Sequence, residues 1–237
     1  MPESLKAIAK MIDHSLLHPT MTDQELINGC LLAKKHDVAA VCIKPYAAKL
    51  AGDILAGSEV QACTVIGFPH GCSRLDVKLD ETQLALTDGA TEIDVVVNIG
   101  KVLSEDWEYV SEEIHRLNVL TVAEGGILKV IFENDYLKDF HKIKLCEICN
   151  EHAVAFVKTS TGYGFVKRDN GMYSYDGATD HDLALMRKTC VPSIQIKAAG
   201  GVRTLNDMLR VRALGVTRVG ATATEAMLAE AKKRGYK

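Results

Sequence analysis

The segment Glu92-Ile93-Asp94-Val95-Val96-Val97 is followed by a helical pattern over Asp106–Ala123 and then by Ile127-Leu128-Lys129-Val130-Ile131-Phe132. Short apolar, β-branched runs of this kind are typical of buried strands, and the longer amphipathic run between them is typical of a helix. A strand, a helix and a second strand in this order predict two parallel strands of one sheet.

The same alternation extends through the rest of the chain. Further strands are predicted at 12–15, Val38–Ile43, Val60–Ile66, Ala153–Val157, Ile194–Ile196 and Arg218–Val219. A helix begins after Thr22, which with Glu25 has the spacing of a capping box. The other helices are predicted at Pro45–Ala56, Arg74–Asp88, Leu137–Glu151, Asp180–Lys188, Leu205–Ala213 and Thr224–Arg234, and the segment Thr159–Gly177 is predicted to be irregular.

Eight such units in 237 residues favour a closed (β/α)8 TIM barrel of the α/β class over an open doubly wound sheet. No G-x-G-x-x-G or G-x-x-x-x-G-K-[ST] motif follows the first strand, so the usual sign of an open nucleotide-binding sheet is missing. No linker or repeat interrupts the pattern. We therefore predict a single domain over residues 1–237.

Composition narrows the functional class. The formal net charge of −3 argues against a general nucleic-acid binder, and no apolar run is long enough for a membrane span. The seven cysteines are an odd number without a disulfide pattern, which indicates a reducing compartment.

Cys146 and Cys149 form a C-x-x-C that could be redox-active or bind a metal. They share one face of a predicted helix and no second ligand pair follows, so we interpret them as core residues. The first eleven residues lack the apolar core of a signal peptide, and a cytoplasmic location is expected.

Ionisable residues occur inside the strand patterns. Asp94 and Lys129 lie within strands, Lys158 ends one, and Lys197 directly follows Ile194–Ile196. Each lysine could extend its charged end to solvent at a strand end. However, the strand ends of a barrel meet at one mouth, where clustered lysines and a carboxylate can keep one amine neutral and nucleophilic. Such an amine forms an iminium with a carbonyl, and this iminium promotes cleavage of a nearby C–C bond.

Two glycine-rich segments follow the last two strands. These are Ala199-Gly200-Gly201-Val202-Arg203 and Gly220-Ala221-Thr222-Ala223-Thr224. Glycines can simply make tight turns, but loops in these two positions of a barrel frequently bind phosphate, and a helix start adds favourable partial charge. Together they predict a phosphate site.

Read in order, several segments resemble the deoxyribose-phosphate aldolase family. They are Ile12-Asp13-His14-Ser15-Leu16-Leu17, Val41-Cys42-Ile43, Thr64-Val65-Ile66-Gly67-Phe68-Pro69, Glu92 to Asn98, Leu128-Lys129-Val130-Ile131, Val157-Lys158-Thr159-Ser160-Thr161-Gly162 and Lys197-Ala198-Ala199-Gly200-Gly201-Val202-Arg203-Thr204. The resemblance implies reversible cleavage of 2-deoxy-D-ribose 5-phosphate to D-glyceraldehyde 3-phosphate and acetaldehyde. It assigns Lys158 as the Schiff-base residue, Lys197 as its tuning neighbour and Asp94 as the acid/base partner.

The resemblance also implies a substrate site. Lys129 matches a lysine of the substrate pocket, and the phosphate region comprises Gly162, Gly200, Gly201, Arg203 and Gly220, with a hydroxyl from Thr222. No metal or organic cofactor is implied, the expected partner is a small sugar phosphate, and a homo-oligomer, dimer or tetramer, is left open. The alternatives are a lysine-dependent aldolase for another or an unphosphorylated sugar or aldehyde, and a non-catalytic barrel that binds sugar phosphates.

Some positions depart from the family pattern. Ala223 lacks a hydroxyl that many members have, and the loop after Gly162 is longer and more polar than usual. A cation from that loop, Lys167 or Arg168, could compensate for the missing donor. Tyr236 matches a tail tyrosine that reaches the site in some members, or lies in a disordered tail.

Overall fold

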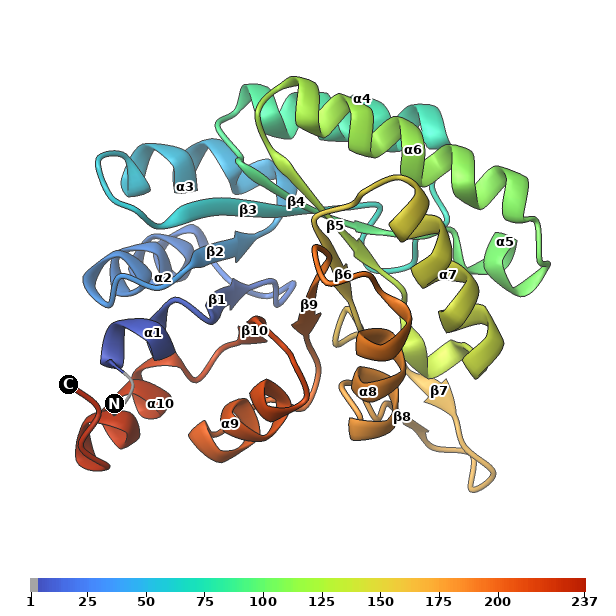
Figure 1. Cartoon of the computed structure of the whole chain (residues 1–237). Helices are drawn as coiled ribbons and strands as arrows, with labels where there is room; N and C mark the ends of the chain where they lie inside the picture. The colour runs from blue at the N-terminus through green and yellow to red at the C-terminus, as the bar shows by residue number, and fades with distance from the viewer. Residues whose placement is uncertain (1–3) are drawn as a thin grey trace.

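Eight parallel strands close into a barrel in the computed structural model, which describes residues 4–237 (Figure 1). Residues 1–3 of the predicted domain lie outside the described residues. The strand order around the barrel is β1-β10-β9-β6-β5-β4-β3-β2, so the predicted (β/α)8 fold is confirmed. The barrel strands are β1 (Ile12–Leu16), β2 (Ala40–Ile43), β3 (Gln61–Ile66), β4 (Glu92–Val96), β5 (Ile127–Ile131), β6 (Phe156–Lys158), β9 (Gln195–Ala198) and β10 (Arg218–Ala221).

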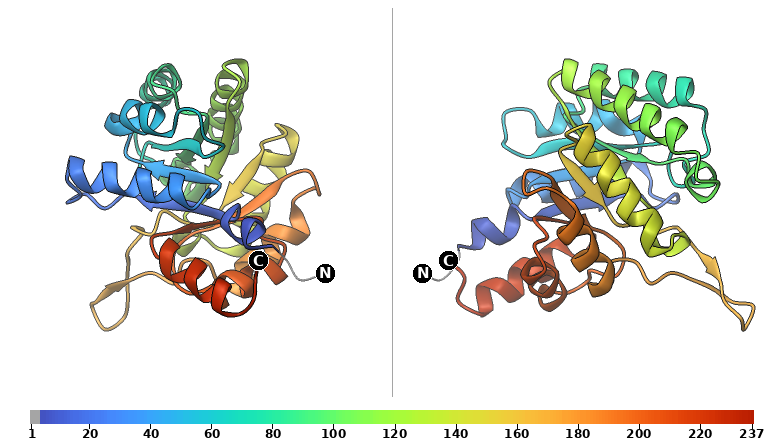
Figure 2. Two further views of the ribbon diagram at one scale, coloured as in Figure 1. Left: turned by 90° about the vertical axis from the view of Figure 1, so that its left-hand side faces the viewer. Right: turned by 45° about the vertical axis from the view of Figure 1, so that its right-hand side comes forward.

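Helices surround this barrel (Figures 1 and 2). They are α2 (Asp23–Lys35), α3 (Ala48–Leu55), α4 (Leu75–Thr87), α6 (Trp107–Ala123), α7 (Asp139–Glu151), α8 (Asp180–Thr189), α9 (Leu205–Ala213) and α10 (Thr224–Lys233), with 3-10 turns at Pro45–Ala47 and Asn134–Tyr136. The predicted capping box is present, because the Thr22 hydroxyl accepts from the Glu25 N–H and the Glu25 carboxylate accepts from the Thr22 N–H. None of the helices in residues 4–237 is long and apolar enough to cross a membrane.

Two short helices and several strand boundaries differ from the prediction. The helices α1 (Leu5–Ala9) and α5 (Ile99–Leu103) were not predicted, since five residues are too few to show a 3.6-residue period. The strand predicted from Ala153 begins at Phe156 instead. Ala153 has a left-handed φ of 49°, which ends the turn after α7 and cannot belong to a strand.

A buried ion pair joins two outer helices to the sheet. Lys78 of α4 lies 2.8 Å from Glu113 of α6 and also donates to the Val96 carbonyl at 2.7 Å. Glu113 accepts in turn from the Asn98 N–H at 2.9 Å. Burial lowers the pKa of Lys78 and raises that of Glu113, but their mutual contact offsets both shifts. The pair therefore fixes the chain just beyond β4, the strand that carries Asp94.

The segment predicted to be irregular between β6 and α8 contains a small antiparallel hairpin. Its strands are β7 (Val166–Lys167) and β8 (Tyr173–Ser174), and it projects away from the barrel (Figures 1 and 2). Two-residue strands are too short to give an alternating pattern, which is why the sequence did not reveal them. The hairpin segment, defined here as residues 163–177, leaves the barrel at the end of β6, directly beside Lys158.

Candidate active site

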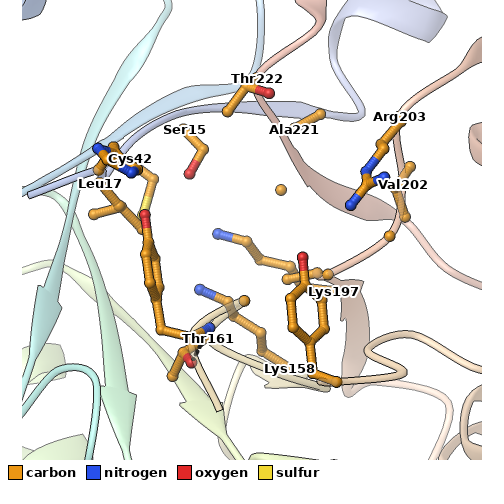
Figure 3. A pocket seen from close by; sticks show the side chains of 18 of the residues that line it. Ser15, Leu17, Cys42, Lys158, Thr161, Lys197, Val202, Arg203, Ala221 and Thr222 are labelled. Carbon is orange, nitrogen blue, oxygen red and sulfur yellow. Dashed lines mark hydrogen bonds between the residues drawn. The ribbon is translucent and has the colours of Figure 1, made fainter. Parts of the chain in front are cut away.

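A cavity of about 360 Å³ opens where the barrel strands end (Figure 3). Its lining residues lie at or just beyond the carboxyl ends of β1, β2, β6, β9 and β10, or in the hairpin segment. They are Ser15, Leu17, His18, Cys42, Lys158, Thr161, Gly162, Tyr163, Phe165, Tyr175, Lys197, Ala199, Gly200, Gly201, Val202, Arg203, Gly220, Ala221 and Thr222. The volume suits a small sugar phosphate.

Lys158 and Lys197 lie on neighbouring strands in direct register and extend into this cavity (Figure 3). Their Nζ atoms both lie 2.7 Å from the same oxygen, Oδ2 of Asp94, which comes from β4, and β5 lies between β4 and β6. The side chains of these strands meet because they point into the barrel interior. The three residues predicted to be catalytic therefore form one hydrogen-bonded group.

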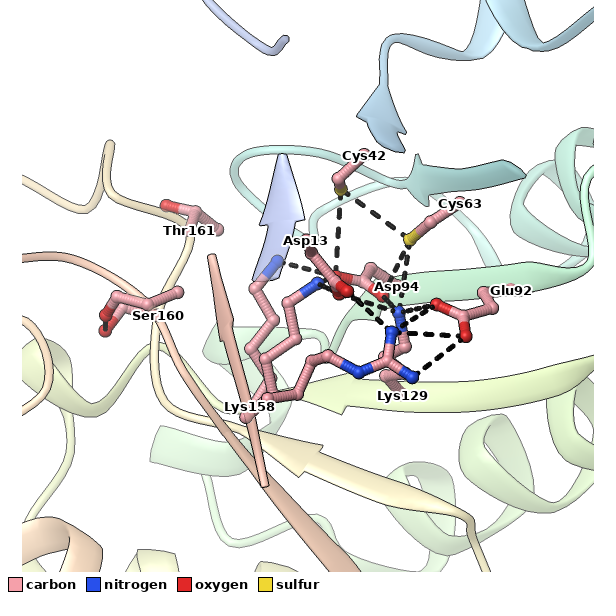
Figure 4. Close-up of polar contacts among 12 residues, drawn as sticks. Asp13, Cys42, Cys63, Glu92, Asp94, Lys129, Lys158, Ser160 and Thr161 are labelled. Atoms are coloured by element: carbon pink, nitrogen blue, oxygen red, sulfur yellow. Dashed lines mark hydrogen bonds and ion pairs between the residues drawn. The ribbon is translucent and has the colours of Figure 1, made fainter. Parts of the chain in front are cut away.

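Further charged residues surround Asp94 below the cavity (Figure 4). Lys129 contacts Asp94 Oδ1 at 3.1 Å, Asp13 at 3.1 Å and Glu92 at 2.5 Å. Lys197 also forms an ion pair with Asp13. Arg218 bridges Asp13 at 2.6 Å and Glu92 at 3.2 Å.

The charges in this network are unequal in number. Three carboxylates, those of Asp13, Glu92 and Asp94, face the four basic side chains of Lys129, Lys158, Lys197 and Arg218. If one of the four is neutral, positive and negative charges balance. A buried network favours such a balance because an uncompensated buried charge is costly.

The contacts indicate which groups keep their charge. Burial opposes ionisation of Asp94, but the ammonium groups of Lys129, Lys158 and Lys197 outweigh it and hold its pKa well below the usual range. Burial also opposes the charged form of Lys197, yet Asp13 and Asp94 together raise its pKa above the ordinary value. The carboxylates around Lys129 raise its pKa in the same way. Lys158 has a single carboxylate partner, Asp94, within residues 4–237.

Lys129 does not line the cavity, although the resemblance placed it in the substrate pocket. It is fully buried and pairs with Phe156, whereas Lys158 pairs with Ile131, two residues further along β5. Side chains on one face of a strand recur every second residue, so Lys129 lies one layer deeper than Lys158. Its contacts are with the carboxylates beneath the cavity. Asp94 does not line the cavity either, but it contacts Lys158 and Lys197, which do.

Two thiols that were not predicted as site residues lie beside the charged residues beneath the cavity. Cys63 contacts Asp94 Oδ1 at 3.2 Å and Lys129 at 3.3 Å, and it lies 3.7 Å from Cys42. The ligand atoms of Cys42, Cys63 and Asp94 are close enough together to hold a metal ion. Both carboxylate oxygens of Asp94, however, already contact lysine ammonium groups, which supply the positive charge there.

Side-chain hydrogen bonds hold the loop that follows Lys158. Thr159 and Ser160 both donate to the Ala199 carbonyl, at 3.0 and 2.9 Å, and so tie the end of β6 to the end of β9. Thr161 contacts the buried carboxylate of Glu133 through its N–H and its hydroxyl. Burial raises the pKa of Glu133. These polar residues therefore serve to position the cavity wall.

The opposite side of the cavity presents unpaired donors. The N–H groups of Gly200, Gly201 and Val202 donate no hydrogen bond to any of residues 4–237. Gly200 and Gly201 have φ values of 82° and 86°, which glycine adopts readily. The guanidinium of Arg203 points toward the cavity and has no ion pair in the described part of the chain (Figure 3). Consecutive free N–H groups beside an arginine suit an anion.

The other residues predicted for the phosphate region lie close by, whereas the proposed compensating cations do not. Gly162, Gly220 and Thr222 line the cavity. Neither Lys167 nor Arg168 does, and Arg168 is engaged with Asp176 at 3.0 Å and with Ser174. Tyr236 packs against the core beside α10 rather than reaching the cavity or lying in a disordered tail.

Comparison with known proteins places this site in a family. Residues 7–224 match the DeoC/LacD family aldolase model. The chain belongs to this family. It is 52% identical to the deoxyribose-phosphate aldolase of Rhodopirellula baltica over 227 residues, covering 96% of this chain and 90% of that protein. It is 42% identical to the deoxyribose-phosphate aldolase of Caldanaerobacter subterraneus subsp. tengcongensis, covering 98% and 97%.

Solved structures agree with this assignment. The aldolase QR15 superposes with a TM-score of 0.86 at 32% identity, covering 96% of each chain. The deoxyribose phosphate aldolase of Aeropyrum pernix, described as having a unique tetrameric structure, gives a TM-score of 0.85 at 28% identity, covering 97% of this chain and 92% of that one.

In this DeoC/LacD family aldolase, several residues of the candidate site were not predicted from the sequence. Asp13, Glu92 and Arg218 carry the same signal that identified Asp94, a charge within or at the start of a strand pattern. Tyr163 and Tyr175 carry no comparable signal, because they lie in a segment without regular periodicity.

Proposed function

We propose that this aldolase cleaves 2-deoxy-D-ribose 5-phosphate reversibly to D-glyceraldehyde 3-phosphate and acetaldehyde through a Schiff base on Lys158. The observation that carries the proposal is one cavity with two unlike ends. At one end Lys158 and Lys197 share Asp94 Oδ2 at 2.7 Å. At the other, three free N–H groups lie beside Arg203. The identity of the sugar phosphate is taken from the names of the relatives.

Lys158 suits the nucleophile better than Lys197. A nucleophilic amine must be neutral, and Lys197 is held in its charged form by two carboxylates. Among the described residues, Asp94 is the one carboxylate that pairs with Lys158, so a neutral Lys158 leaves fewer ion pairs unmatched than a neutral Lys197. Lys129 contacts three carboxylates and does not line the cavity.

The chemical steps follow from these roles. The free electron pair of the neutral Lys158 amine attacks C1 of the open-chain sugar, and a proton from its nitrogen passes to the former carbonyl oxygen. Loss of water gives the iminium. Removal of the proton from the C3 hydroxyl breaks the C2–C3 bond, and the electron pair moves into the iminium to give an enamine. Glyceraldehyde 3-phosphate leaves, the enamine takes up a proton at C2, and water releases acetaldehyde. Lys197, an ammonium group that lines the cavity and contacts Asp94, is the proton carrier we assign to these transfers.

The phosphate is assigned to the opposite end of the cavity. There Gly200, Gly201 and Val202 offer backbone donors, and Arg203 offers a positive charge. Gly220 of β10 and Thr222, in the turn before α10, lie beside them. A side chain at Gly200 would collide with the backbone of Gly177, whose Cα lies 3.0 Å from the position of an added Cβ. Glycine thus permits the close packing of two loops at this end.

Trapping and cleavage assays test the proposal. Borohydride with acetaldehyde should add one ethyl group to the protein, and peptide mapping should place it on Lys158. Lys158→Ala should abolish the label and lower turnover by several orders of magnitude. Lys49→Ala, which changes an exposed lysine outside the cavity, serves as the matched control. A label on Lys129 or Lys197 would contradict the assignment.

Comparison of two substrates tests the phosphate end. Deoxyribose 5-phosphate should be cleaved with a higher kcat/KM than deoxyribose, and inorganic phosphate should compete with the phosphorylated sugar. Equal efficiency on both sugars would favour an aldolase for unphosphorylated substrates. A protein that binds the sugar phosphate without any trapping would be a non-catalytic binder.

We further propose a cytoplasmic enzyme that forms a homo-oligomer. All seven cysteines are free, which fits a reducing compartment, and the structural relative from Aeropyrum pernix is described as tetrameric. Sedimentation of the purified protein tests the oligomer.

A further inference from the structure

The hairpin segment 163–177 is built into the cavity wall although its tip projects from the barrel (Figure 2). Asp135, which follows β5, accepts from the N–H groups of Asp176 at 2.5 Å and Gly177 at 3.0 Å. The Tyr136 hydroxyl donates to the Phe165 carbonyl at 3.1 Å. Both legs of the hairpin are therefore fastened to the same loop of the barrel.

The returning leg carries Tyr175 onto the glycine loop. A Cβ added to Gly200 would lie 3.3 Å from the Tyr175 ring, so the ring packs directly against that glycine. Its other neighbour is Phe165, whose ring centroid is 5.4 Å away in an edge-to-face arrangement. The Ala178 N–H, three residues on, donates to the Gly200 carbonyl at 3.0 Å. The Tyr175 ring thus packs against Gly200 and Phe165, and the chain just after it is hydrogen-bonded to the same glycine.

The hydroxyl of Tyr175 has no protein partner. Tyr175 lines the cavity and is half-buried, yet its hydroxyl makes no hydrogen bond with any residue of the described chain. The ring that carries this hydroxyl packs against Gly200, whose N–H is one of the free donors. The start of α10 lacks a side-chain hydrogen bond to its first turn, because Ala223 has no hydroxyl. A donor is therefore absent at Ala223 and present at Tyr175.

We propose that the Tyr175 hydroxyl donates a hydrogen bond to the phosphate group of the substrate, so that the hairpin segment forms part of the phosphate site. This inference rests on the proposed function only for the identity of the sugar, because the same contact would bind any small phosphorylated aldehyde or inorganic phosphate. The hairpin supplies this donor through an uncharged tyrosine rather than through its cations, since Arg168 is paired with Asp176 and Lys167 lies outside the cavity.

Tyr175→Phe tests the contact because it removes only the hydroxyl and keeps the ring against Gly200. The loss of a hydrogen bond to a charged group corresponds to a change of about 10-fold or more in an equilibrium constant. We expect KM for deoxyribose 5-phosphate and the inhibition constant of inorganic phosphate both to rise about 10-fold. The kcat for the phosphorylated sugar, and kcat/KM for free deoxyribose, should change little.

Tyr173→Phe is the matched control. Tyr173 lies two residues away on β8, is 63% exposed and does not line the cavity, so its variant should behave as the wild type. Thermal unfolding of both variants checks that the hairpin is intact.

Three results would overturn the inference. The first is an unchanged phosphate inhibition constant in Tyr175→Phe. The second is an equal loss of kcat/KM on both sugars, which would mean that the hydroxyl does not act through the phosphate. The third is an equal effect of Tyr173→Phe, which would point to the stability of the hairpin. Calorimetric binding of inorganic phosphate tests the contact without catalysis. A wild type that binds phosphate but does not cleave the sugar would contradict the proposed function alone.

Discussion

Replacement of Lys197 by methionine tests how the charge network controls imine formation. Methionine has a similar length and no charge. In the wild type the Nζ atoms of Lys158 and Lys197 are each 2.7 Å from the same oxygen, so they are at most 5.4 Å apart, twice that distance. Two positive charges at this separation repel each other by about 3 kcal/mol at an effective dielectric constant of about 20. The cation on Lys197 therefore favours a neutral amine on Lys158.

Loss of that cation should move imine formation to higher pH. About 3 kcal/mol corresponds to roughly 2 pH units, because one unit equals about 1.4 kcal/mol. The charge count gives the same direction. Without Lys197, three carboxylates face three basic groups, and the network is balanced only while Lys158 keeps its proton. We thus expect the midpoint of the pH profile to rise by roughly 2 units and turnover at neutral pH to fall.

The assay is the initial rate of borohydride-trapped ethylation by acetaldehyde across pH, measured by intact mass. Acetaldehyde carries no phosphate, so the phosphate end of the cavity does not influence the result. Lys197→Arg is the control, since it keeps the charge and should shift the midpoint far less. Thermal unfolding verifies the fold, because removing one partner of a buried ion pair can cost about 3–5 kcal/mol. A methionine variant with the wild-type midpoint and rate would refute the reasoning.

Three further outcomes are expected. Asp94→Asn should retain some imine trapping yet slow the uptake of deuterium from heavy water at the acetaldehyde methyl group, and exchange at the wild-type rate would contradict its proton-transfer role. Gly201→Val should raise KM for deoxyribose 5-phosphate and hardly affect acetaldehyde trapping. The reasons are that Gly201 lies at the proposed phosphate end and has a φ of 86° that valine avoids. A loss of trapping in a folded variant would contradict the separation of the two ends. Burial lowers the pKa of His14 to about 4 from its ordinary 6.5. The unfolded chain therefore binds a proton that the folded chain does not between these values, and the His14 contribution to unfolding free energy should fall by about 3 kcal/mol as pH drops from 6.5 to 4. Urea unfolding of the wild type and His14→Asn should show a steeper loss in the wild type, and parallel pH curves would contradict this.

The sequence was sufficient for the barrel and for the placement of Lys158 and Lys197 at one cavity, because both depend on local patterns. Alternating apolar runs specify the strands, and a charge at the end of a buried strand stands out, as Lys158 and Lys197 do. The depth of a residue within the barrel, in contrast, cannot be predicted from a local pattern. Lys129 and Lys158 give the same signal, yet one lies a layer below the other, because depth depends on how adjacent strands are staggered.

The contacts made by loops were also beyond sequence reasoning. Nothing in the order of residues brings Tyr175 to Gly200 or Asp135 to Gly177, since these contacts depend on how a projecting hairpin is fastened to a neighbouring loop. The same holds for Lys78 and Glu113, each of which has the appearance of a surface charge on its helix, although together they are buried.

The two ends of the cavity are built on opposite principles, and this makes their contributions separable. At the chemical end, every charge is paired: Asp94 contacts three lysines, and Arg218, which is distant in sequence, contacts two of the three carboxylates around Lys129. The charge count of this network favours one neutral basic group, and the carboxylate contacts of each lysine favour Lys158 as that group. At the phosphate end the donors are unpaired until a ligand arrives, and they come from loops rather than strands. A change among the paired charges should therefore alter the pH dependence and kcat, whereas a change among the free donors should alter KM for phosphorylated substrates.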